Sequence, residues 1–424
     1  MKLDRTKGPA CAPIKQLVFP HTAPLITTGG RKAWLYPTGG IGVAKLYLIY
    51  PLGYRITQEP WMMKAAGQLM LSGNESYKAR VIQEELETIG ATIDVHIDAR
   101  YHQVVISAGS EHISEALEIW LKHSSSVAFP QQEVDVYVSA AVSDLQMRQT
   151  TPRYWSQRRL MEAMCGKQHH LGRFSEVADV QLINSDSLKS YSKWFSGGAP
   201  GFIILCGDAS AQHLGDLGTA LGAPLFDLSI PEDVPQPQEQ LIWNTHVEHT
   251  NQASISWGLP GIQISGEDYY AFWVLNTLLG GFFGSRLMKN IREEKGLTYG
   301  IHSSLVNHGI DYHWYISSEV KAGNVAQVND EIRKELLKLS SEYATSEELE
   351  KVKRYLCGNL KMSFDGAFSM ASKRRDLILW GRSESFYDEA IARIAATSPE
   401  SLKELAGNFL KPESFYVSVA GVTQ

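Results

Sequence analysis

Arg292 and Tyr299 are the two side chains whose types and spacing best suit polar chemistry in this sequence. They stand seven residues apart, close to two helical turns, but Gly296 lies between them. We therefore expect a helix with Arg292 in its last turn, a glycine cap, and a strand that carries Tyr299. Both side chains would then face one cleft, as fixed donors of the type that stabilises developing negative charge. The alternative is structural: Arg292 pairs with Glu293 or Glu294, and Tyr299 is a core aromatic residue.

The histidines and cysteines do not form a recognisable site. His246 and His249 precede a predicted strand, and we interpret them as a solvent-exposed or internally satisfied pair. His169 and His170 fit a structural turn. The cysteines include no C-x-x-C pair, which favours reduced, buried thiols over a disulfide scaffold. Three further histidines lie in one predicted hairpin without a carboxylate cluster, His302, His308 and His313, and the four cysteines are scattered at Cys11, Cys165, Cys206 and Cys357.

The elements that must position these residues occur twice in the same order. Each half begins with an apolar strand, at 41–50 and 253–258, and continues with two helices, two alternating strands, several longer helices and a last apolar strand. A connector with three prolines in ten residues, 230–239, separates the halves. We predict an N-terminal domain at 1–229, a linker at 230–240 and a C-terminal domain at 241–424. Strands interleaved with helix clusters indicate α+β domains, each an antiparallel-rich sheet with helices packed on one face.

Length and composition limit the classes of protein to which this chain can belong. The chain has 424 residues, of which 44% are hydrophobic and 20% charged, as in globular proteins of two or three domains. Its formal net charge of −6 gives no indication of nucleic-acid binding. No window approaches the roughly 18 apolar residues of a membrane span, and the first residues lack the apolar core of a secretory signal. We therefore expect no membrane segment and a cytoplasmic location.

The stretch 278–300 resembles the C-terminal domain of the insulinase/pitrilysin zinc peptidases, which include the mitochondrial processing peptidase. It contains Gly280-Gly281, Ser285-Arg286, Ile291-Arg292-Glu293 and Gly296-Leu297-x-Tyr299 together. The resemblance spans nearly the whole chain and implies half of a metalloprotease clamshell. It also implies that Arg292 and Tyr299 hold the substrate backbone and stabilise the oxyanion formed at a zinc ion.

Active members of that family carry H-x-x-E-H on a helix near the N-terminus, with two histidines as zinc ligands and the glutamate as general base. The matching helix, 60–73, contains no histidine and no glutamate. The resemblance places Lys64 and Gln68 at the histidine positions and Gly67 at the position of the base. It places only Asp144 in the region of the further glutamate ligand. We therefore expect no metal and no cofactor in this chain.

These expectations favour the metal-free subunit of a heterodimeric zinc endopeptidase. Its partner would be a homologous subunit that holds the zinc, and the pair would bind an extended peptide by strand addition at a sheet edge. Arg292 and Tyr299 would serve the partner's zinc, and the Lys64 ammonium is a candidate to replace the charge of the missing metal. The alternatives are a non-enzymatic homodimeric peptide-binding or scaffold protein, and an autonomous metallopeptidase with an unrecognised site.

Overall fold

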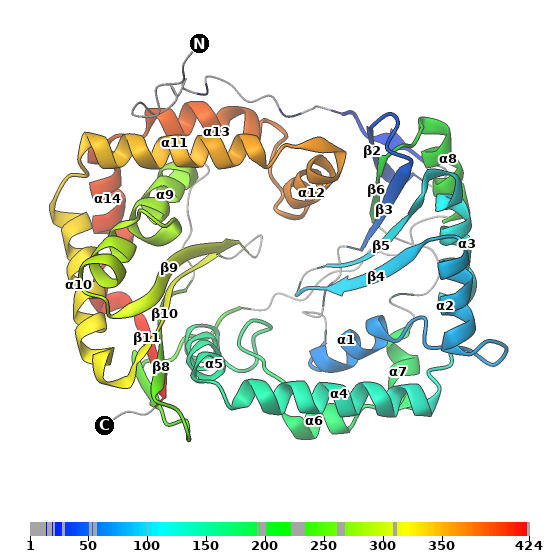
Figure 1. Cartoon of the computed structure of the whole chain (residues 1–424), viewed down its shortest axis with the longest axis horizontal. Coiled ribbons are helices and arrows are strands. Elements are labelled where there is room, and N and C mark those ends of the chain that lie inside the picture. The colour runs from blue at the N-terminus through cyan, green and yellow to red at the C-terminus, as the bar shows by residue number, and fades with distance from the viewer. Residues whose placement is uncertain are drawn as a thin grey trace, which may run out of the picture.

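The computed structural model of the chain contains two β-sheets, each with its own group of helices (Figure 1). The residues that the structure describes are 14, 19, 22–27, 30–50, 53, 57–99, 101–192, 195, 201–221, 234–260, 268–307 and 312–421. Cys11, His308 and residues 230–233 of the proline-rich segment lie outside them. The predicted domain boundaries at 229 and 241 stay a prediction. The described part of the connector contains no helix and runs beside one, where Gln236 N–H donates to the Cys165 carbonyl (2.9 Å).

The first sheet contains six strands in the order β1-β2-β6-β3-β5-β4. Strand β2 pairs with β6 in parallel, and the other pairs are antiparallel. The central strands β3 and β6 are apolar on both faces, because both faces are covered by helices. The strands are β1 (Leu25–Ile26), β2 (Lys32–Pro37), β3 (Val43–Tyr50), β4 (Thr92–Ile97), β5 (His102–Gly109) and β6 (Phe202–Gly207).

The second sheet repeats that topology with five strands in the order β7-β11-β8-β10-β9. Its parallel pair is β7 with β11, which corresponds to β2 with β6, and its edge strand β9 corresponds to β4. The repeated order of elements predicted from the sequence is therefore present as a repeated strand order. The strands are β7 (Ile242–Thr245), β8 (Gln252–Leu259), β9 (Thr298–Asn307), β10 (Tyr312–Lys321) and β11 (Tyr416–Gly421).

Helices of the first half cover one face of the first sheet. The inner face of β3 contributes Leu46 and Leu48 to a core that also includes Met63 and Trp120 from helices. The helices of this half are α1 (Pro60–Gln68), α2 (Ala79–Thr88), α3 (Ile113–Ser124), α4 (Gln131–Gln149), α5 (Pro152–Cys165), α6 (Val177–Gln181), α7 (Ser185–Ser192) and α8 (Ala211–Ala220).

Helices of the second half cover the corresponding face of the second sheet. Trp257 of β8 and Trp314 of β10 are buried beneath them. Thr345 and Glu348 form a capping box at the start of α11, and Ser398 caps α14 ahead of a proline. The helices are α9 (Asp268–Asn276), the π-helical segments η3 (Thr277–Gly281) and η4 (Met288–Glu294), α10 (Val325–Ser341), α11 (Ser346–Met362), α12 (Gly366–Leu379), α13 (Ser385–Ala396) and α14 (Pro399–Phe409).

The two halves exchange one helix each. Helix α5 of the first half lies on the second sheet, where Met164 packs in a cluster with Tyr416, and Ser156 Oγ lies 2.5 Å from Ser256 Oγ. Helix α12 of the second half lies on the first sheet, where Ala371 packs in a cluster that includes Tyr47. In Figure 1, α5 lies beside β8 and β11, while α12 lies toward the first sheet. The predicted α+β class is confirmed, and the exchange adds a helix to the second face of each sheet.

Phe19 ties the start of the described chain to the second half. Its ring is fully buried in the core of that half, 5.5 Å from the Tyr387 ring and 5.6 Å from the Phe364 ring between centroids. Its backbone N–H donates to Asp388 Oδ1 (2.7 Å). The chain then crosses to the first sheet, where β1 begins at Leu25.

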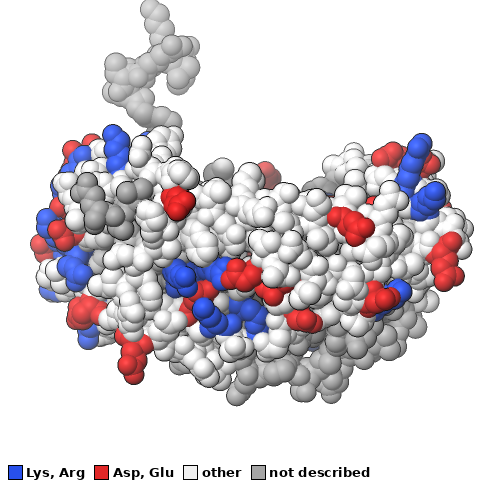
Figure 2. Space-filling model, turned by 90° about the horizontal axis from the view of Figure 1, so that it is seen from below, with Lys and Arg blue, Asp and Glu red and all other residues white. Residues whose placement is uncertain are grey.

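Acidic and basic side chains are mixed over the face seen in Figure 2, without a broad patch of one sign. This agrees with the modest net charge of the whole sequence. Among the described residues, no helix combines the length and the apolar character that crossing a membrane requires.

Candidate functional site

Arg292 and Tyr299 lie on the elements that the sequence predicts. Arg292 is in the last turn of η4, and Tyr299 is the second residue of β9. Gly296 between them has φ +62°, a left-handed conformation that glycine adopts without strain. The Leu297 N–H donates to the Ile291 carbonyl (2.9 Å), which closes the end of the helix. The π-helical form of η4 was not expected, and such segments are frequent at functional sites.

The structure brings Arg292 and Tyr299 into contact. Arg292 Cζ lies 5.3 Å from the centroid of the Tyr299 ring and 4.5 Å from that of Phe283. Within the described ranges, the guanidinium forms no ion pair, so the predicted alternative pairing with Glu293 or Glu294 is absent there. Tyr299 is 90% exposed, so its interpretation as a core residue is wrong. The exposed Tyr299 and the half-buried Arg292 therefore form a pair of donors that solvent can reach.

A buried polar network holds η4 against α10. Asn290 Nδ2 donates to Glu331 Oε2 (3.1 Å) and Glu335 Oε1 (2.7 Å), and Lys295 Nζ donates to Glu331 Oε2 (2.5 Å). The hydrogen bond from Lys295, followed by the one from Lys334, lowers the pKa of Glu331 to about 2. This network fixes the helix end from which Arg292 extends.

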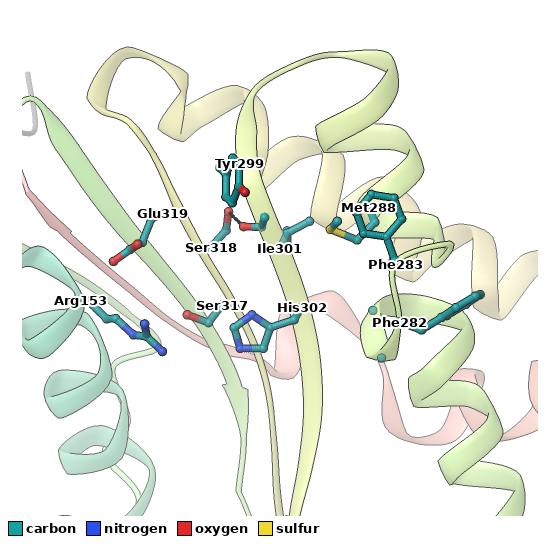
Figure 3. Close-up of a pocket in the computed structure, with 13 residues that line it drawn as sticks. Arg153, Phe282, Phe283, Met288, Tyr299, Ile301, His302, Ser317, Ser318 and Glu319 are labelled. Carbon is teal, nitrogen blue, oxygen red and sulfur yellow. Dashed lines mark hydrogen bonds between the residues drawn. The ribbon is translucent and has the colours of Figure 1, made fainter. Parts of the chain in front are cut away.

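A pocket of about 410 Å³ adjoins the pair at the edge strand β9. Figure 3 shows Phe283 and Met288 on one side of that strand and Arg153 and Glu319 on the other. Arg153 comes from the exchanged helix α5, so both halves of the chain contribute. The lining residues are Arg153, Gly280, Gly281, Phe282, Phe283, Met288, Tyr299, Gly300, Ile301, His302, Ser317, Ser318 and Glu319.

The pocket contains one imidazole, that of His302. Desolvation by the surrounding protein, and then repulsion from Arg153, lowers its pKa below the ordinary value for histidine, although part of the His302 surface is exposed. A lowered pKa favours the neutral ring near neutral pH, which can donate and accept one hydrogen bond each. The apolar wall of the pocket and these polar groups together suit a segment of polypeptide.

The helix that the resemblance aligns with the zinc motif is α1, and of its motif positions only Gly67 is enclosed by neighbouring side chains. Lys64 and Gln68 lie one turn apart on its exposed face. Gly67 is buried, and a Cβ atom at this position would lie 2.4 Å from Ile97 Cδ1 and 2.9 Å from Phe195 Cε1. A glutamate therefore has no space at this position unless Ile97 and Phe195 move.

The surroundings of Lys64 contain charges but no set of metal ligands. Asp144 of α4 is held by Arg148 (2.8 Å), one turn away. Desolvation, followed by repulsion from Arg148, lowers the pKa of Lys64, although its surface is exposed, and Asp98 opposes the shift. An ammonium, an amide and a carboxylate already paired with arginine are poor ligands for zinc. The residues at these positions do not fit the metal.

The other histidines and cysteines that were considered as site residues lie in surroundings that do not favour chemistry. Among the described residues, no three His, Cys, Asp or Glu side chains cluster as a metal site would require. His169 and His170 are buried with their rings 4.1 Å apart, and burial lowers the pKa of His313 to about 4. Burial also raises the pKa of Cys206 to about 12, which makes a reactive thiolate unavailable near neutral pH.

Sequence reasoning missed two contributors to the site. Phe283 contacts Arg292, and Arg153 reaches the pocket from the other half of the chain. A local signal existed for Phe283, because two consecutive phenylalanines inside a glycine-rich turn are unusual for a flexible loop. No local signal existed for Arg153, whose place depends on the helix exchange.

Comparisons with known proteins support the resemblance to the insulinase/pitrilysin zinc peptidases. The profile described as "Peptidase M16 inactive domain" matches residues 188–356. The chain is 25% identical over 344 residues to "Uncharacterized zinc protease YmxG" of Bacillus subtilis, covering 80% of this chain and 83% of that protein. It is 23% identical over 306 residues, 70% of each protein, to "Non-peptidase homolog YmxG" of Helicobacter pylori.

The crystal structure of a peptidase M16 inactive domain from Pseudomonas fluorescens has the same fold. It aligns with a TM-score of 0.82 at 19% identity, over 95% of this chain and 99% of that one. The profile match and the full-length fold both point to this type of peptidase. The enclosed Gly67 leaves no space on α1 for the glutamate of the zinc motif. The chain is therefore similar to the M16 family, the insulinase and pitrilysin type of zinc peptidase, and its residues 188–356 match the inactive domain of that family.

Proposed function

We propose that this chain is the metal-free subunit of a heterodimeric zinc endopeptidase. It binds an extended peptide and presents Arg292 and Tyr299 to a catalytic centre held by a homologous H-x-x-E-H subunit. The observation that carries the proposal is the contact between the half-buried Arg292 and the exposed Tyr299, in a chain whose helix α1 offers no zinc ligands. The proposed location is the cytoplasm, with zinc in the partner alone.

Two features support peptide binding. Strands β4 and β9 each lie at one edge of their sheet and pair with one neighbour, so each has a second row of backbone groups that an added strand could pair with. The pocket beside β9 offers apolar surface from Phe282 and Met288 next to the donors of Arg292 and Tyr299. In this arrangement, main-chain pairing would align the peptide and the two donors would orient one carbonyl group.

The first experiment is capture of the tagged full-length chain from lysate of its native cells, with mass spectrometry of the bound proteins. Recovery of a homologous protein of similar size with an H-x-x-E-H motif supports the heterodimer. Recovery of this chain alone, or of a large unrelated complex, contradicts it.

The roles of the pair are tested in the reconstituted heterodimer. We expect Arg292→Ala to lower kcat/KM by about 10²–10³-fold, the usual effect of removing one oxyanion donor, and Tyr299→Phe to lower it less. The matched control is Arg354→Ala, which removes an exposed arginine of α11. Equal activity of Arg292→Ala and the control would exclude the proposed role.

A non-enzymatic function is the second candidate. The relative in Helicobacter pylori is named a non-peptidase homolog, and a homodimeric peptide-binding or scaffold protein would need neither zinc nor a catalytic partner. In both functions Lys64 is a candidate contact for a peptide carbonyl. Unchanged peptide affinity and unchanged partner binding in Lys64→Ala would exclude that role. Light scattering of the purified chain separates a homodimer from a monomer that awaits its partner.

A further inference from the structure

The glycine-rich turn before η4 points its two phenylalanines in different directions. Phe282 has an extended backbone (φ −154°, ψ 169°), and successive side chains of an extended segment point to opposite sides. The Phe282 ring lies 4.9 Å from the Tyr355 ring of α11, between centroids. The Phe283 ring lies 4.5 Å from Arg292 Cζ instead. One ring thus anchors the turn, and the other meets the guanidinium.

Phe283 does not contribute to the hydrophobic core of the second half. It is 62% exposed. The distance from Arg292 Cζ to the ring centroid is 4.5 Å for Phe283 and 5.3 Å for Tyr299, so Phe283 is the nearer ring. Contacts of a guanidinium with ring faces restrict its motion without using its N–H groups, which stay available to an acceptor.

We propose that Phe283 is a positioning residue that, together with Tyr299, holds the Arg292 guanidinium ready to bind a peptide carbonyl. The proposal rests on the proposed function, because it assigns Arg292 a ligand. Without the Phe283 ring, Arg292 would sample more rotamers and would lose entropy on binding. An exposed cation–π contact corresponds to an effect of about two- to fivefold on binding.

The direct test measures the mobility of Arg292 in the full-length protein. NMR of protein labelled with ¹⁵N-arginine reports rotation of each guanidinium group, and Arg292→Lys assigns the signal. We expect Phe283→Leu to accelerate the rotation and Phe283→Tyr to retain the wild-type rate. The control Tyr343→Leu removes another aromatic ring, 58% exposed and 4.5 Å from Lys403 Nζ, and should leave the Arg292 signal unchanged. An unchanged signal in Phe283→Leu would overturn the proposal.

Fluorescence anisotropy with fluorescein-labelled casein, an unfolded polypeptide, then separates the two proposals. If the wild-type chain binds casein, we expect about two- to fivefold weaker binding in Phe283→Leu, recovery in Phe283→Tyr, and no further effect of Phe283→Leu in an Arg292→Ala background. Equal affinities of wild type and Phe283→Leu would overturn the positioning role. Absence of casein binding by the wild type would count against the proposed function, and the mobility measurement would still decide the role of Phe283.

Discussion

At the scale of single residues, the chain combines a pair of accessible donors with a helix α1 that offers no zinc ligands. Tyr299 is exposed and Arg292 is half-buried, while Gly67 lies under Ile97 and Phe195. A zinc motif on α1 would therefore need more than the replacement of Lys64 and Gln68 by histidines. The space that a general base would need is filled by the edge strand β4, to which Ile97 belongs.

Two helical glycines should respond oppositely to alanine. At Gly67 a Cβ atom would lie 2.4 Å from Ile97, so we expect Gly67→Ala to lower the free energy of unfolding by about 1–3 kcal/mol. At Gly358 of α11 no atom lies within 4 Å of the new Cβ, so Gly358→Ala should raise it by about 0.5–1 kcal/mol. Urea unfolding of both variants measures the difference. Equal effects would show that α1 is not closed by Ile97.

Acid should weaken the network that holds η4. The pKa of Glu331 is lowered from 4.5 to about 2 in the folded chain, so its contribution to stability is present above pH 4.5 and is lost as the pH falls toward 2. We expect Glu331→Gln to be less stable than wild type at pH 7 and to lose less stability between pH 4.5 and 2. Urea midpoints over this pH range test this, and parallel curves for both proteins would contradict it.

At the scale of elements, strands and helix caps could be predicted from neighbouring residues, whereas the packing of distant segments could not. The strand at 92–97, the capping box at Thr345 and the proline start of α14 follow from neighbouring residues, and all are present. The strands β2 and β7 were not predicted, because each obtains its place by parallel pairing with a strand over 160 residues later. The exchange of α5 and α12 is equally non-local, since both helices have the same apolar pattern whichever sheet they cover.

The helix exchange predicts that a substitution in α5, before the linker, destabilises the second sheet, after it. Met164 of α5 is fully buried, and we expect Met164→Ala to cost about 2–5 kcal/mol. Met147→Ala, at an exposed methionine of α4, should cost less than about 0.5 kcal/mol. Hydrogen exchange should accelerate in β8 and β11 in the first variant, although Met164 precedes the linker. Acceleration confined to the first sheet would contradict the placement of α5.

At the scale of the whole molecule, the described chain begins and ends in the second half. Phe19 is buried there, and β11 closes the second sheet. The first half is therefore connected to the second by the segment after Phe19, by the linker and by both exchanged helices. The apolar runs at 41–50 and 253–258 could be predicted as strands, but this connectivity depends on contacts that no short window contains.

Phe19 should contribute to stability as a core residue does. We expect Phe19→Ala to cost about 3–5 kcal/mol, because it leaves a cavity among Phe364, Tyr387 and Arg374, and Phe19→Leu to cost less. Thermal unfolding of both variants measures this. A melting temperature equal to that of wild type in Phe19→Ala would show that the segment is not anchored in solution.

The helix exchange also sets an order of events during synthesis. Chains fold from the N-terminus as they leave the ribosome. The first sheet is complete once β6 has emerged, but its second face, with Trp34, Tyr47 and Phe202, has no cover until residues 366–379 follow as α12. The nascent first half thus carries an uncovered aromatic surface while more than 150 further residues are made. A ribosome-bound chain stalled before α12 would be a substrate for chaperones, and one stalled beyond β11 would not.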